Sequence, residues 1–189
     1  HNLSVTPIAF PQQFATCLLL HKIAKMIGKF AFSTELVRAM FEHGASNGWL
    51  DSNQLPLAPT ANGYVLFPGW SRLAELAQLR NALPHGPSAV SDWLTAAYAT
   101  NAQTPTVIEA LSLATEWNLI DVQHLAGTNG FNLSLAALRS EVTIGRLAEA
   151  MAMLKRLRAS AEQCLAWTRT AIGVAVYARD GAQAEDIKN

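Results

Sequence analysis

The feature that most constrains this chain is a helical spacing of apolar residues that recurs along most of its length. In residues 12–27 large apolar side chains fall close to a helical period, and residues 33–41 and 69–80 repeat that spacing. Gly28 and the stretch 42–48 interrupt it, because glycine ends helices at little steric cost. Half of the residues are hydrophobic, so the chain has ample material for a core. We therefore predict a mostly helical protein.

Two short stretches depart from the helical spacing and carry hairpin signals. Asn62-Gly63 lies between apolar runs, and Asn129-Gly130 does so again. Asn-Gly favours the tight two-residue turn of a β-hairpin. The predicted fold class is therefore mostly α with two small β-hairpins, an α+β arrangement. The expected hairpin units comprise residues 49–51 with 55–67 and residues 118–121 with 123–134.

The two hairpin segments also match each other in order and in residue type. Trp49 and Asp51 of the first correspond to Trp117 and Asp121 of the second, roughly 70 residues later. Both segments read as two helices, a short strand, a hairpin and a further helix, which predicts an internal repeat. The predicted domains are a first repeat at 1–83, a second at 84–142, a C-terminal helical segment at 143–180 and a disordered tail at 181–189.

The phrase NGYVLFPGWSRLAEL (62–76) resembles the wing end of bacterial winged-helix proteins, where the last strand turns into a helix. The resemblance covers roughly residues 12–142 as two degenerate copies, with two helices before each wing instead of the usual three. Tandem winged helices occur in transcription regulators, plasmid replication initiators and the kite subunits of condensin-type complexes. The resemblance thus implies a bacterial protein associated with DNA.

Charge distinguishes the two predicted repeats. Fourteen basic and fourteen acidic side chains cancel, so no global field favours a nucleic acid. Residues 81–138 contain no Lys or Arg, and the second repeat should therefore repel a duplex. A nucleic acid could be contacted through the first repeat only. The candidate contact residues there, for a nucleic acid or an acidic protein, are Lys22, Lys25, Lys29 and Arg38; a solvated helix face is the simpler interpretation of the three lysines.

The C-terminal third holds the longest periodic segment. An unbroken helix over 144–178 would span about 50 Å at ~1.5 Å per residue, which exceeds the width of a small domain. It should therefore break near Ser160 or Gly173, or project and pack on a second copy. The residues predicted to contact a second chain or the N-terminal LSVTPIAF segment are Leu154, Leu165 and Ile172. A second basic patch, read as a solvated face or a nucleic-acid or partner surface, comprises Lys155, Arg156 and Arg158.

Sequence patterns that would indicate a catalytic or metal-binding site are weak. Cys17 and His21 could share a metal on one helical face, but zinc needs three or four ligands and no other Cys or His lies nearby in the sequence. Asp51 and Asp121 could act as paired carboxylates, although bonding backbone N–H groups is the simpler role. Nucleophile, phosphate-loop, dinucleotide and zinc-protease motifs are absent from the sequence. We therefore predict no catalytic residue, no metal and no cofactor.

Three functional hypotheses follow. The leading one is a non-enzymatic assembly or adaptor subunit in a nucleic-acid-associated complex, which binds another protein chain or itself as a homodimer. The second is a DNA-binding transcription or replication regulator that uses the first repeat. The third is a small-molecule-binding or catalytic domain with a pocket lined by tryptophans. Two cysteines favour a reduced, cytoplasmic setting, and no apolar run is long enough to predict a membrane span.

Overall fold

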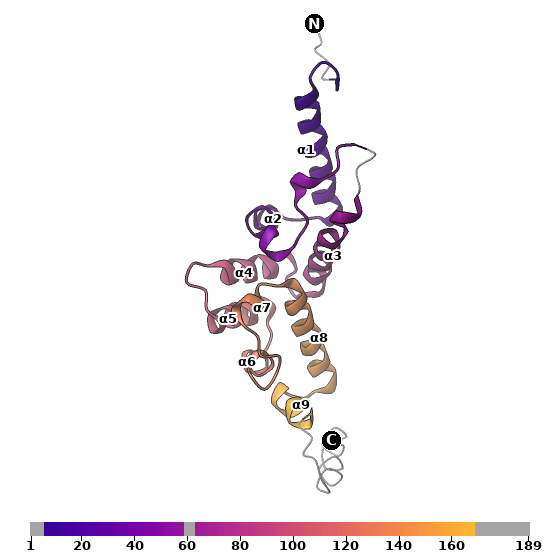
Figure 1. The fold of residues 1–189 in the computed structure, drawn as a ribbon. Helices are drawn as coiled ribbons and strands as arrows, with labels where there is room; N and C mark the ends of the chain where they lie inside the picture. The colour runs from indigo at the N-terminus through magenta and orange to yellow at the C-terminus, as the bar shows by residue number, and fades with distance from the viewer. Residues whose placement is uncertain (1–5, 59–62, 169–189) are drawn as a thin grey trace. The chain divides into compact units, whose positions relative to one another are not determined.

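The computed structural model describes residues 6–58 and 63–168, which form helices joined by turns and loops (Figure 1). The chain divides into two compact units, His1–Asn81 (unit 1) and Ala82–Asn189 (unit 2). The division lies close to the predicted repeat boundary between residues 83 and 84. No strand occurs in either described range, so the predicted α+β fold class is wrong.

The first predicted hairpin is replaced by two short 3₁₀ helices. These are η1 (Ser52–Gln54) and η2 (Gly63–Leu66), while Asn62 lies outside the described residues. The Asp51 carboxylate accepts the Asn53 N–H at 2.9 Å, which is the bond of an N-cap. The chain therefore turns directly after the buried Trp49 and does not extend into a strand.

The second predicted hairpin is replaced by helix α6 (Leu119–Ala126). The Asn118 side chain accepts the Asp121 N–H at 3.1 Å, and this cap starts a helix where a strand was expected. The Asn-Gly pair lies in the turn after α6, where the Phe131 N–H donates to the Leu125 carbonyl at 2.7 Å. Because this segment is helical and the first is not, the two segments lack the shared hairpin on which the predicted internal repeat was based.

Unit 1 is built from helices α1 (Pro11–Phe30), α2 (Thr34–Asn47) and α3 (Phe67–Ala82). Ser33 caps α2 by accepting the Leu36 N–H at 3.3 Å, the role that serine often has at a helix N-terminus. The buried apolar side chains come from all three helices, from the connection between α1 and α2 and from the loop after α2. They are Met26, Phe32, Leu36, Met40, Trp49, Leu50, Leu73, Leu76, Ala77 and Leu79.

A buried arginine ties the end of α3 to the end of α1. The Arg80 guanidinium donates to the carbonyls of Phe30 at 2.6 Å and Ala31 at 2.8 Å, and it lies over the Phe32 ring. Carbonyls at a helix C-terminus carry partial negative charge and have no partner within the helix. Arg80 therefore satisfies those groups while its own charge is compensated inside unit 1.

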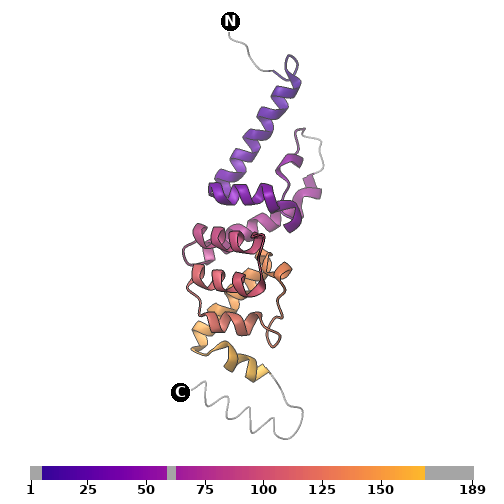
Figure 2. The ribbon, with the colours of Figure 1, turned by 90° about the vertical axis from the view of Figure 1, so that its left-hand side faces the viewer.

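Unit 2 is a stack of helices in which α4, α5, α6 and α9 follow one another as neighbours, and α8 runs alongside (Figures 1 and 2). Trp93 of α4 is fully buried, and its indole N–H donates to the Leu138 carbonyl at 2.7 Å. This bond joins α4 to α7 across the core. The helices are α4 (Pro87–Tyr98), α5 (Thr104–Thr115), α6, α7 (Leu135–Leu138), α8 (Glu141–Leu157) and α9 (Ala161–Thr168).

The long C-terminal periodic segment breaks close to Ser160, one of the expected alternatives. Helix α8 ends with Arg158 in the left-handed conformation (φ 53°). Helix α9 then begins at Ala161, whose N–H donates to the Asp121 carboxylate of α6 at 2.7 Å. Gly173, Ile172 and the predicted tail at 181–189 lie outside the described residues. Within the part of the chain that the structure describes, no helix is both long and apolar enough to cross a bilayer.

Candidate protein-docking site

Unit 1 has a hollow whose walls are entirely apolar. Its volume is about 180 Å³. One wall comes from the loop after α2, a second from the segment after η1, and a third from η2 and the first turn of α3. The lining residues are Leu50, Leu55, Pro56, Leu66, Phe67 and Trp70.

A glycine allows two walls of this hollow to approach each other closely. The Leu50 N–H donates to the Gly69 carbonyl at 3.1 Å, which holds the start of α3 against the loop after α2. A Cβ atom at Gly69 would lie 2.9 Å from the Cα and N atoms of Leu50. Only glycine permits this approach without a shift of the backbone. The FPG sequence at 67–69 therefore begins a helix and also brings it close to Leu50.

Two polar side chains hold the segment that carries Leu55 and Pro56. Asp51 accepts from the Asn53 N–H at 2.9 Å and from the Gln54 side-chain amide at 3.1 Å. The Lys22 ammonium, from α1, donates to the Pro56 carbonyl. The wall of the hollow is thus fixed by a local cap on one side and by a bond to α1 on the other.

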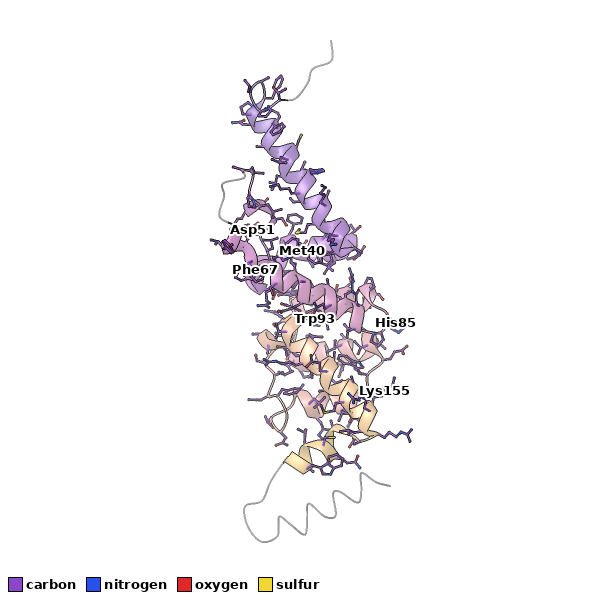
Figure 3. The ribbon with its side chains drawn as sticks, turned by 90° about the vertical axis from the view of Figure 1, so that its right-hand side faces the viewer. Met40, Asp51, Phe67, His85, Trp93 and Lys155 are labelled. Atoms are coloured by element: carbon purple, nitrogen blue, oxygen red, sulfur yellow. The ribbon has the colours of Figure 1, made fainter. Side chains whose placement is uncertain are left out.

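Aromatic and aliphatic side chains continue the apolar surface beyond the hollow. Phe67 is 66% exposed and Tyr64 is 88% exposed, and Val65 lies between them in the chain. Trp70 is held from behind by Phe30, with their ring centroids 5.1 Å apart. Figure 3 shows Phe67 and Asp51 at the same edge of unit 1. Exposed apolar groups that gather next to a hollow are typical of interaction sites.

The predicted basic contact residues of unit 1 are not equivalent. Lys22 is half-buried and bonded to Pro56, whereas Lys25, Lys29 and Arg38 are exposed. The spacing of the three lysines places them on one face of α1. No Asp or Glu precedes Glu35 in the sequence. Lys22 contacts Pro56 in the wall of the hollow, so α1 borders the hollow. This helix carries basic side chains and no acidic ones.

The predicted residues of the C-terminal segment also fall in different places. Lys155, Arg156 and Arg158 are exposed at the end of α8. Leu154 is buried in the interior of unit 2, Leu165 is half-buried on α9, and Ile172 lies outside the described residues. The predicted interface through these leucines stays a prediction, and Leu154 has a packing role within unit 2.

The residues considered for catalysis or metal binding are aspartates, cysteines and a histidine from both units. Asp51 and Asp121 each accept a backbone N–H, the simpler role that the sequence suggested. Cys17 and Cys164 are free thiols. Burial raises the pKa of the Cys164 thiol, and the charge of Asp121 raises that pKa further. No three His, Cys, Asp or Glu side chains of the described ranges come together as a metal site would require.

Sequence reasoning missed the hollow because its walls come from three separate segments. The available signal was the density of large apolar residues in NGYVLFPGW, which exceeds what a solvated turn needs. Comparison with known proteins supplies no relative: the chain matches no family model, no curated protein and no solved structure. Its function is therefore argued from the site itself.

Proposed function

We propose that this chain is a non-enzymatic adaptor or assembly subunit that binds another protein through the apolar hollow of unit 1. The observation that carries the proposal is the continuity of the hollow with exposed Tyr64, Val65 and Phe67. Monomeric soluble proteins rarely expose a large contiguous apolar surface, and such a surface is typical of an interaction site.

The lining favours a protein segment over a small metabolite. Small-molecule sites are mostly apolar too, but they include a few polar groups that orient the ligand. No side chain that lines this hollow carries a polar group except the indole N–H of Trp70. Affinity would thus come from buried apolar area, and specificity from the shape of the anchor and from charges at the edge.

The volume and the border indicate the chemistry of the partner. A cavity of about 150 Å³ accommodates benzene, so a hollow of about 180 Å³ accepts one aromatic or branched aliphatic side chain. The positive face of α1 favours acidic residues next to that anchor. The expected partner is an amphipathic helical segment with a Phe or Leu anchor and flanking Glu or Asp.

A synthetic peptide can test this proposal with the full chain. The probe is a fluorescein-labelled, helix-forming peptide with Phe and Leu at positions i and i+4 and Glu residues beside them. We expect saturable binding in fluorescence anisotropy, with an affinity in the micromolar range. Replacing both anchors by Ser should abolish binding, and replacing Glu by Lys should weaken it.

Two aspartate variants locate the binding surface. Phe67→Asp should lower the affinity of the peptide by at least about tenfold, because it places a charge in the lining. Phe41→Asp is the matched control, since Phe41 is 55% exposed on α2 and does not line the hollow. Equal loss of binding in both variants, or no binding beyond that of the Ser peptide, would overturn the proposal.

A further inference from the structure

Unit 2 has a second hollow, of different chemistry, between α4 and α5. Its volume is about 280 Å³. Both polar and apolar side chains line it: His85, Ser88, Asp92, Ala110, Leu113 and Ala114. The exposed Leu113 (84%) stands at its rim. None of these residues belongs to the docking site of unit 1.

The rim of this hollow is held by two residues in the left-handed conformation. His85 (φ 59°) and Glu116 (φ 57°) both occupy a region that favours glycine. Their side chains meet, with 3.0 Å between His85 Nε2 and Glu116 Oε1. The Ser88 hydroxyl also donates to the His85 carbonyl at 3.0 Å. The loop before α4 is thereby joined to the end of α5, and the hollow between them has a defined shape.

The surface around the hollow is negative. Asp92, Glu109 and Glu116 are exposed there, and no Lys or Arg occurs between residues 81 and 138. Asp92 and Glu109 form no ion pair with a described residue. This α4–α5 surface therefore combines the exposed Leu113 with two carboxylates, Asp92 and Glu109, that form no ion pair with a described residue.

The end of α8 has the opposite character. Met153 is 60% exposed and Leu157 is 42% exposed, and Lys155, Arg156 and Arg158 stand around them. These three cations form no ion pair with a described residue. In Figures 1 and 2 this end of α8 lies at the α9 end of the stack, whereas α4 lies at the other end. Figure 3 labels one residue of each surface, His85 at the α4–α5 hollow and Lys155 near the end of α8.

We propose that unit 2 binds a second copy of this chain head to tail, with the end of α8 from one copy seated on the α4–α5 surface of the next. Met153 or Leu157 then packs on Leu113, and the cations lie beside Asp92 and Glu109. Complementary charge and complementary apolar groups support this pairing. The surfaces differ, so the contact is heterologous and leads to a ring or an open chain of copies.

Two charge-reversed forms of the full chain provide the test. The α8 variant is Lys155→Glu with Arg156→Glu, and the α4–α5 variant is Asp92→Lys with Glu109→Lys. Mass is measured by sedimentation against protein concentration at low salt. Wild type should associate as concentration rises, whereas each variant alone should need at least about tenfold more protein, because it places like charges opposite each other.

Mixing the two variants is the decisive measurement. The acidic α8 end of one variant then meets the basic surface of the other, and the remaining wild-type surfaces also match, so association should return. Lys25→Glu with Lys29→Glu is the matched control, since it changes net charge as the α8 variant does but acts on α1.

Three results would each contradict the proposed head-to-tail contact. The wild type could stay monomeric at every concentration, the mixture of variants could fail to associate, or the α1 control could dissociate as the α8 variant does. Peptide binding by unit 1 is measured in the same samples. It should be unchanged in the α8 and α4–α5 variants, so failure of the head-to-tail contact and failure of the docking proposal can be told apart.

Discussion

Two segments contain a Trp, an Asp and an Asn-Gly pair in the same order but form different structures. One follows α2 in unit 1, and the other follows α5 in unit 2. In unit 1 the chain forms the short helix η1, and a distant glycine, Gly69, brings α3 against Leu50 beside an apolar hollow. In unit 2 the chain forms α6 at once, and Gly130 folds the next turn back on the end of that helix. Similar short sequences can therefore begin different structures, because different distant contacts hold them.

The largest effect is expected at Gly130. A Cβ atom there would collide with the Leu125 and His124 carbonyl oxygens, and backbone atoms cannot move aside as a flexible side chain can. Gly130→Ala should therefore destabilise unit 2 by about 3 kcal/mol, measured by urea unfolding followed by circular dichroism. Gly145→Ala in α8, where nothing lies near the added methyl, should stabilise it by about 0.5–1 kcal/mol. Equal midpoints for the two variants would contradict this account of the turn.

Gly69→Ala should have a smaller effect on stability and a larger one on binding. The added methyl meets Leu50 at 2.9 Å, so α3 has to move away from the loop at a cost of about 2 kcal/mol. That movement opens the hollow, and the Phe/Leu peptide should lose affinity. Gly28→Ala in α1 serves as the control, because its methyl meets open space. Retained peptide affinity in Gly69→Ala would show that Gly69 does not shape the site.

The two aspartates distinguish a local bond from a tertiary one. Asp121 accepts the Ala161 N–H across 40 residues of chain, whereas Asp51 accepts the Asn53 N–H two residues away. Asp121→Ala should cost about 1–2 kcal/mol and expose α9 to hydrogen exchange. Asp51→Ala should cost less than about 1 kcal/mol and leave hydrogen exchange at α9 unchanged. Similar losses, with no change in exchange at α9, would remove the distinction.

The smallest effect concerns the thiol of Cys164. Burial raises its pKa and the charge of Asp121 raises it further, so little of the reactive thiolate is present at mildly alkaline pH. Asp121→Asn removes the second cause, which lowers the pKa and should speed alkylation of Cys164 by iodoacetamide. Mass spectrometry of the labelled peptide gives the rate, and the exposed Cys17 is the internal reference. An unchanged ratio of the two rates would count against the influence of Asp121.

Local signals in the sequence were sufficient for the long helices. The apolar spacing of residues 12–27 predicted most of α1, but the expected end at Gly28 is wrong, because the helix continues to Phe30. Ser33 caps α2, and Gly48 ends α2 in the left-handed conformation. Such signals act between residues a few positions apart, where periodicity and capping chemistry decide the backbone. The break of the C-terminal segment near Ser160 was foreseen for a different reason, namely that an unbroken helix is too long for a small domain.

The tertiary structure alone decided the short apolar runs and the sites. Residues 49–51 and 118–121 are too short for periodicity to separate strand from helix. Local caps start both conformations, Asp51 on the Asn53 N–H and Asn118 on the Asp121 N–H. Bonds that the local pattern does not contain then hold them, such as Leu50 with Gly69 and Asp121 with Ala161. The hollow of unit 1 likewise needs Lys22 on Pro56 and Phe30 behind Trp70, which only folding brings together. Contacts between distant residues fix these features, because neither partner's local sequence encodes the other.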